Sequence, residues 1–176
     1  MQPAATTQIV QSIVEETHDI VLVLPDGATM EFLTSPEDDY DFCVIKGTIP
    51  GGGFVPLHSH PDIETFLVLS GTLEALTETD AGLGWKEVHA GDYLHVESDA
   101  RHAWRNRGEE PGIAMVITTR RLGRLFLEMG KPINGAPEPP TTDDLARLAA
   151  LAGEYGHWLA SPEENAAVGI ELPPLA

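Results

Sequence analysis

The feature that most constrains this chain is a series of about ten short β-rich segments, separated by turn residues, between residues 20 and 120. PDG at 25–27 and DAG at 80–82 are typical turn sequences, and Pro50 with three glycines ends another segment. Many short strands at this spacing favour an antiparallel sandwich or barrel over alternating βαβ units. The predicted strands cover residues 20–24, 29–33, 42–49, 54–60, 65–69, 73–78, 85–89, 93–96, 102–105 and 113–119.

The last third of the chain changes to helix-like patterns. Apolar residues at i, i+3, i+4 and i+7 predict a short amphipathic helix over 122–129, and a proline-rich break follows at 134–140. Thr141 and Asp144 form a capping-box pattern ahead of a second helix that ends near Gly156. Residues 160–176 have no clear pattern, and we expect them to be irregular. The chain is therefore expected to be one domain, in which a β-barrel over 1–121 carries a helical extension over 122–176, packed on the barrel or on a partner subunit.

Charge excludes some partners. With 28 acidic against 10 basic residues the net charge is −18, which repels nucleic-acid phosphates and anionic lipid surfaces. The N-terminal sequence lacks the pattern of a secretory signal, and the apolar runs are too short to span a bilayer, so a cytoplasmic protein is expected. Cys43 is the only cysteine, which excludes an intrachain disulfide, and its apolar neighbours suggest a buried, inert thiol.

The stretch GGFVPLHSHPDIETFLVLSG, residues 52–71, carries the first chemical signal. His58 and His60 are two residues apart on a predicted strand, so both side chains project from one face, and Glu64 has the same parity. Two imidazoles and a carboxylate suit Fe, Mn, Co, Ni or Zn. Taken alone, the same residues could also be two exposed histidines and a solvated glutamate.

A second stretch, GDYLHVESDARHAWRN at 91–106, makes a specific resemblance visible. The first stretch is similar to the cupin motif G-x5-H-x-H-x3-E-x6-G, from Gly52 to Gly71 without a gap. The second resembles the other cupin motif, G-x5-P-x-G-x2-H-x3-N, at Gly91, His102 and Asn106. It departs from this motif at Glu97, where proline is expected, and at Asp99, where glycine is expected. Both departures concern the geometry of a turn rather than the set of metal ligands.

The resemblance implies an all-β fold, an antiparallel double-stranded β-helix or jelly-roll barrel, with short C-terminal α-helices. It also implies one divalent metal ion per chain, held by His58, His60, Glu64 and His102, with Fe, Mn, Ni or Co favoured. Four protein ligands on a metal that prefers six leave positions for water, dioxygen or substrate. Zinc is possible too, and tetrahedral zinc held by these four groups would have no open position. Family resemblance further suggests a homodimer, with the N-terminal segment or the C-terminal helices at its interface.

Cupins catalyse many reactions, so the resemblance does not fix the chemistry. RLFLEMGKP at 124–132, the proline-rich break and LARLAALAGEYGHWL at 145–159 loosely resemble the tail of bacterial quercetin dioxygenase-like cupins. This favours a dioxygenase acting on a small enolic or phenolic substrate, such as a flavonol or diketone, with Glu64 as ligand, general base or both. The alternatives are a metal-assisted isomerase or cyclase and a non-catalytic metal- or small-ligand-binding protein.

The positions of several other residues in the strand pattern suggest what their side chains do. Phe66 and Trp104 share parity with Glu64 and His102, so both are expected to face the cavity. Phe54 and His95 are further candidates for the pocket lining. Asn106 is expected to be a structural turn residue. The other histidines, among them His18, His89 and His157, are expected to be incidental, and the arginines between residues 101 and 124 are expected to form ordinary ion pairs.

Overall fold

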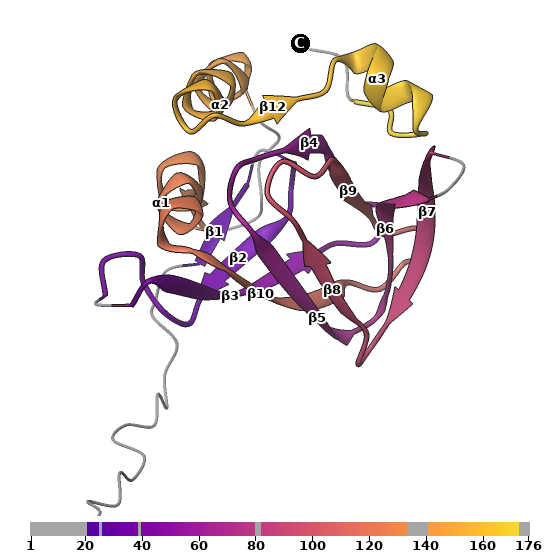
Figure 1. The fold of residues 1–176 in the computed structure, drawn as a ribbon, viewed down its shortest axis with the longest axis horizontal. Helices are drawn as coiled ribbons and strands as arrows, with labels where there is room; N and C mark the ends of the chain where they lie inside the picture. The colour runs from indigo at the N-terminus through magenta and orange to yellow at the C-terminus, as the bar shows by residue number, and fades with distance from the viewer. Residues whose placement is uncertain (1–20, 25, 39, 80–81, 134–140, 173–176) are drawn as a thin grey trace, which may run out of the picture.

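Two antiparallel sheets face each other across a shared core in the computed structural model, which describes residues 21–24, 26–38, 40–79, 82–133 and 141–172 (Figure 1). One sheet has seven strands in the order β11-β1-β2-β3-β10-β5-β8, and the other has five in the order β12-β4-β9-β6-β7. The strands are β1 Val21–Val23, β2 Thr29–Phe32, β3 Phe42–Ile49, β4 Phe54–Ser59, β5 Glu64–Ser70, β6 Thr72–Thr79, β7 Gly82–His89, β8 Tyr93–Val96, β9 His102–Arg105, β10 Gly112–Thr119, β11 Lys131–Pro132 and β12 Trp158–Leu159. The predicted all-β barrel is confirmed, and each predicted strand is observed with ends that differ by at most about three residues.

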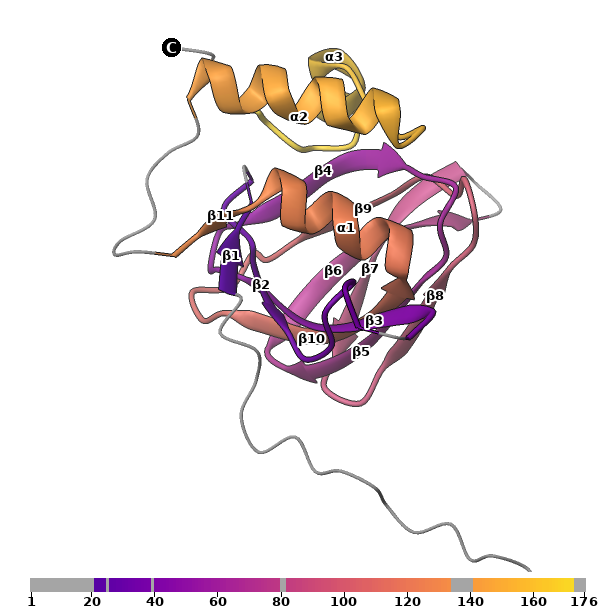
Figure 2. The ribbon, with the colours of Figure 1, turned by 90° about the vertical axis from the view of Figure 1, so that its left-hand side faces the viewer.

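Three short helices follow the barrel strands. They are α1 Arg120–Met129, α2 Thr142–Glu154 and α3 Pro162–Ala167. The predicted first helix buries the expected stripe of Leu122, Leu125 and Phe126, and the predicted capping box between Thr141 and Asp144 begins α2. Figure 2 shows α1 across one side of the barrel and α2 with α3 above it. No described helix is long and apolar enough to cross a bilayer.

The expectation that residues 160–176 are irregular is wrong for 162–167, which form α3. Ser161 accepts a hydrogen bond from the backbone N–H of Glu164, the Glu164 carboxylate accepts one from the backbone N–H of Ser161, and Pro162 occupies the first turn. This S-x-x-E capping box with an early proline is a helix-start signal that the sequence contains. The proline-rich break at 134–140, the N-terminal segment 1–20 with His18, and residues 173–176 lie outside the described residues.

The core has two parts. The larger lies between the sheets and beneath α1, and it includes Phe32, Ile45, Val68 and Trp104. Cys43 is buried in it, as predicted, and burial raises the pKa of its thiol. The smaller part lies outside the five-stranded sheet and joins that sheet to the C-terminal segment; its buried members are Leu57, Leu76, Ala103 and Ile170.

Candidate metal centre

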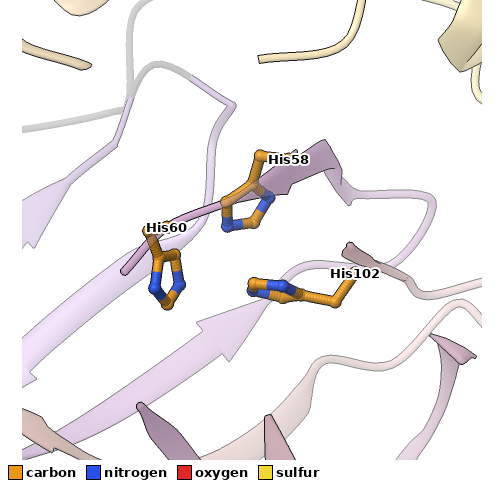
Figure 3. Close-up of side chains that lie close together, drawn as sticks. All are labelled: His58, His60 and His102. Carbon is orange, nitrogen blue, oxygen red and sulfur yellow. The ribbon is translucent and has the colours of Figure 1, made fainter. Parts of the chain in front are cut away.

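Three histidines converge at one end of the five-stranded sheet (Figure 3). His58 lies near the end of β4 and is paired in register with His102, the first residue of β9, while His60 follows β4 directly. The ring centroids of His58 and His102 are 4.2 Å apart, and that of His60 lies 5.0 Å from that of His102. One nitrogen of each ring lies within 4.8 Å of the others. The structure thus brings together the three imidazoles that the two sequence motifs single out.

The protein also fixes which nitrogen each ring offers. Nδ1 of His58 donates to the carbonyl of Pro56 at 2.7 Å, Nδ1 of His60 to that of Asp62 at 2.8 Å, and Nδ1 of His102 to that of Ala100 at 2.9 Å. Because a carbonyl can only accept, each neutral ring carries its proton on Nδ1 and presents Nε2 as a lone pair. Nε2 of His60 and Nε2 of His102 are buried and have no hydrogen-bond partner. Three oriented lone pairs around one point are what a metal ion requires.

Glu64 completes this cluster. It begins β5, it is 4% exposed, and its Oε2 lies 3.4 Å from Nε2 of His60 and 3.5 Å from Nε2 of His102. Both distances exceed those of an ordinary hydrogen bond. Burial raises the pKa of the Glu64 carboxyl, but the contacts with His102 and His60, when these rings carry a proton on Nε2, outweigh burial and hold this pKa far below its usual range. A buried, ionised carboxylate beside unpartnered imidazoles fits a divalent cation, so the residues present suit the metal that the cupin resemblance implies.

The histidines differ in their electrostatic surroundings. Burial, followed by the neighbouring His102, lowers the pKa of His58 well below its usual value, so this ring is neutral at pH 7. Burial also lowers the pKa of His60, but the contact with Glu64 outweighs burial and the net shift is upward. The Glu64 carboxylate, at the start of β5, therefore favours the protonated form of His60.

The predicted pocket residues divide into two groups. Phe66 and Trp104 lie in the barrel interior, 8% and 4% exposed, with ring centroids 4.6 Å apart. His95 lies on the outer face of β8, where it contacts Thr65 and Glu97, so the expectation that it lines the pocket is corrected. It pairs in register with Thr65, whose side chain points away from the interior occupied by Glu64 and Phe66.

Phe54 is also corrected. A register shift between Val55 and His58 inserts a bulge into β4, so the simple alternation that would give Phe54 and His58 the same face is broken. Val55 packs into the interior, and Phe54 packs against the outer cluster around Leu57. Pro56 lies inside this irregularity, and a proline within a strand is a sequence signal for such a bulge.

The second motif region keeps its turn despite the two departures. Asp99 has φ +62°, the only positive φ of a non-glycine among the described residues, so an aspartate adopts the conformation for which the motif uses glycine. Its backbone N–H donates to the carbonyl of His60 at 2.7 Å and so ties this turn to the ligand segment. Asn106 is a structural residue, as predicted: its buried side chain bonds Ile49, Gly108 and Glu110.

The arginines near the second motif have partners within the protein. Arg105 and Arg107 share the carboxylate of Glu74, and Arg121 forms an ion pair with Asp62. Arg101 lies over the ring of Trp158, 4.3 Å from its centroid. The first three arginines form the ordinary ion pairs that were expected, whereas Arg101 makes a cation–π contact instead.

One residue near the centre was not predicted from the sequence. The ring of His157 lies 4.9 Å from that of His60, centroid to centroid, and its Nε2 is buried without a partner. Burial, followed by His60, lowers the pKa of His157 to about 4. His157, expected to be without partners, thus lies beside one of the clustered histidines. No motif spacing links it to the ligands; only the fold of the C-terminal segment brings it there.

Comparisons with known proteins agree with this geometry. Residues 46–118, which contain both motifs, match the sequence profile of the cupin domain. This part of the chain therefore matches a cupin domain, and the match covers less than half of the chain. No sequence among the curated proteins matches it significantly.

Three solved structures of similar fold are distant in sequence. An RmlC-like cupin from Shewanella frigidimarina has 18% identity and a TM-score of 0.50, over 64% of this chain and 92% of that one. A predicted oxalate decarboxylase from Thermotoga maritima has 23% identity and a TM-score of 0.46, over 52% of this chain and 79% of that one. A DMSP lyase from Ruegeria pomeroyi has 26% identity and a TM-score of 0.40, over 45% of this chain and only 38% of the lyase. The first of these supports the fold and carries no conclusion about activity.

Proposed function

We propose that this protein is a metal-dependent cupin enzyme that oxidises a small enolic or phenolic molecule with dioxygen. The observation that carries the proposal is the donor set inside the barrel: three histidines with one nitrogen each within 4.8 Å of the others, and the buried Glu64 carboxylate 3.4 and 3.5 Å from Nε2 of His60 and of His102. A divalent ion such as Fe, Mn, Co or Ni, held by His58, His60, Glu64 and His102, would supply Lewis acidity and coordination positions that protein atoms do not fill.

The chain's own residues would then bind and orient the substrate. Phe66 and Trp104 form an aromatic wall on the same interior face as Glu64 and His102, which suits a flat, conjugated molecule. Nε1 of Trp104 is buried without a partner and can only donate, so it suits a substrate oxygen. The carbonyls of Pro56, Asp62 and Ala100 keep the rings in one tautomer while the substrate binds.

Glu64 is proposed to hold the proton of the substrate hydroxyl. Its buried carboxylate lies beside His60 and His102 and is ionised at neutral pH, so it has a free position for this proton. The contacts that hold its pKa far below the usual range must give way as the proton is taken. Glu64→Gln keeps the size and one oxygen but cannot accept this proton. We expect the variant to retain metal with reduced affinity and to lose turnover by about a hundredfold or more. Turnover at the wild-type rate would remove Glu64 from proton transfer.

The experiment that tests the whole proposal has two steps. Protein expressed with a limited metal supply is analysed for bound Fe, Mn, Co and Ni, and the loaded forms are screened with flavonols and diketones in an oxygen electrode. Oxygen uptake in proportion to product supports the dioxygenase. Turnover without oxygen uptake would instead identify a metal-assisted isomerase or cyclase, and failure to bind any divalent ion would overturn the metal centre.

The homodimer stays a prediction. Its support is a group of exposed apolar side chains on the outer face of the seven-stranded sheet, contributed by β5, β8 and β10: Leu67, Leu69, Tyr93 and Ile117. A second copy packed on this face would remove these side chains from water. Sedimentation at several protein concentrations distinguishes a dimer from a monomer.

A further inference from the structure

Buried nitrogens without partners are concentrated around the metal centre. Among the side chains that the structure describes, four such atoms occur: Nε2 of His60, Nε2 of His102, Nε1 of Trp104 and Nε2 of His157. The first two belong to proposed ligands, Trp104 is two residues from His102, and the ring of His157 contacts that of His60. Because buried polar atoms in folded proteins are nearly always paired, each of these four atoms calls for a partner. Their common location indicates that the partners belong to molecules bound at this centre.

The C-terminal segment holds His157 firmly in this position. Strand β12 pairs with β4, so that Trp158 lies opposite Ser59 and Leu159 opposite the ligand His58. The backbone N–H of His157 donates to the carbonyl of Ala152 at 2.7 Å, at the end of α2. Directly before His157, Gly156 has φ +70°, a conformation that turns the chain from α2 toward the centre.

Two arginines add further connections. The guanidinium of Arg121 bonds both the carboxylate of Asp62 and the backbone carbonyl of Tyr155, and so links the ligand segment to the end of α2. Arg101, next to the ligand His102, covers the ring of Trp158. The segment 155–160 is therefore attached to both ligand-bearing strands, and His157 is fixed against His60 by the fold.

We propose that His157 is a binding residue for the oxygen-bearing molecule that the metal centre takes, so that the C-terminal segment forms one wall of the site. Its enclosed Nε2 would form a hydrogen bond with an oxygen of that molecule. This inference rests on the proposed function, since it assumes a ligand at the metal, and it assigns a role to a residue that lies outside both cupin motifs. His157 is distinct from the proposed ligands: it is not one of the three histidines whose nitrogens lie within 4.8 Å of one another, and unlike Glu64, which contacts Nε2 of two of them, it meets the group through its ring on His60.

The test uses the Co(II)-loaded full chain and maltol, a small hydroxypyranone that chelates divalent ions through two oxygen atoms. Visible absorption of the Co(II) form gives the Kd for maltol, and a chelator competition gives the affinity for Co(II). His157→Phe retains an aromatic ring to pack on His60 but has no nitrogen. His157→Gln keeps a polar atom near the position of Nε2, and His157→Leu is a second variant without a polar atom. His89→Ala removes an exposed histidine, 58% accessible, as the matched control.

We expect His157→Phe and His157→Leu to weaken maltol binding by about tenfold, the effect of one lost hydrogen bond, while the Co(II) affinity and spectrum stay as in the wild type. His157→Gln is expected to recover most of the loss, and His89→Ala to bind maltol normally. Unchanged maltol affinity in both apolar variants would overturn the inference. Loss of Co(II) together with maltol would also overturn it, since His157 would then support the fold of the centre. If the wild type itself binds no Co(II), the proposed function fails instead, and the two failures are thus distinguishable.

Discussion

The two sheets of the barrel differ in what covers their outer faces. The seven-stranded sheet exposes apolar side chains, among them Leu67, Leu69 and Ile117. The five-stranded sheet buries Leu57 and its neighbours beneath residues 158–172. Two of the three clustered histidines belong to the covered sheet, where His58 and His102 pair across β4 and β9. The comparison teaches that the C-terminal segment is part of the structure that builds the site.

Residues 158–172, here called the cover, are held on the five-stranded sheet by polar contacts as well as by apolar packing. Asn165 is fully buried; its Oδ1 accepts from the backbone N–H of Leu57 at 2.9 Å, and its Nδ2 donates to the carbonyls of Ala160 and Ser161. Trp85 of the same sheet donates its indole N–H to the carbonyl of Val168 at 2.8 Å. Leu57 precedes the ligand His58 directly, so the cover and the metal centre share one strand.

The largest effect is expected from removing metal ligands. The double variant His58→Ala/His102→Ala removes two of four donors, and since tight metal sites bind with roughly 10–16 kcal/mol in total, we expect the Kd for Co(II) to rise by about a thousandfold or more. The measurement is calorimetric titration of the metal-free protein.

The matched control is His89→Ala/His95→Ala, which removes two exposed histidines, one from each sheet. We expect this control to bind Co(II) like the wild type. Equal loss in both double variants would mean that the imidazoles of His58 and His102 have no special role in binding the ion.

The next effect concerns the cover itself. Asn165→Ala leaves the backbone N–H of Leu57 and the carbonyl of Ala160 without the partners that the Asn165 side chain supplies, whereas the Ser161 carbonyl keeps the backbone N–H of residue 165. We therefore expect this variant to lower the free energy of unfolding by about 2–4 kcal/mol in urea denaturation. Val21→Thr on β1 of the seven-stranded sheet changes an exposed side chain outside the proposed dimer face, and it is expected to stay within about 0.5 kcal/mol of the wild type. A small effect of Asn165→Ala would show that the cover contributes little to the barrel.

The covered sheet also shows where sequence analysis succeeds and where it stops. The motif spacing correctly predicted that His58, His60 and His102 lie together. The spacing of His58 and His60 along one strand is a local property, and the pairing of β4 with β9 brings His102 opposite His58. The parity argument worked for Phe66 and Trp104. Most strand segments could be predicted as well, because turn residues separate them so regularly.

The positions of three side chains could not be predicted correctly from the sequence, and each has a physical reason. Parity failed for Phe54, since a bulge at Pro56 shifts the alternation by one residue. His95 was placed without knowledge of its partner strand, and only pairing with Thr65 shows that it faces outward. His157 could not be found, because its position depends on how α2 ends and on the pairing of β12 with β4, both long-range features.

A smaller effect on the free energy of unfolding is expected beside the seven-stranded sheet, and it depends on pH. Burial raises the pKa of Asp26, in the turn between β1 and β2, to about 6 from 3.8. Because the folded-state pKa is raised, the stabilisation from the protonated form is fully present below about pH 4 and is lost as the pH rises through about 6. Asp26→Asn keeps the acceptor for the backbone N–H of Ala28, so we expect it to be more stable than the wild type by about 1–2 kcal/mol at pH 7.

The measurement for Asp26 is urea denaturation of both proteins at pH 4.5 and at pH 7. The difference between them should shrink toward the lower pH, since the wild-type carboxyl then becomes neutral. A stability difference that is the same at both pH values would contradict the raised pKa.

The smallest effect is expected at Asp99, on the turn that contacts the ligand segment. With φ +62° its side chain opposes the left-handed conformation, yet its backbone N–H must keep that position to reach the carbonyl of His60. Glycine adopts this conformation without the steric cost, so we expect Asp99→Gly to be more stable than Asp99→Ala by about 1 kcal/mol. At an extended position the order would be reversed, because alanine loses less backbone entropy on folding. Urea denaturation of the two variants therefore reports on the turn itself, and equal or higher stability of Asp99→Ala would show that this turn does not hold the left-handed conformation beside the metal centre.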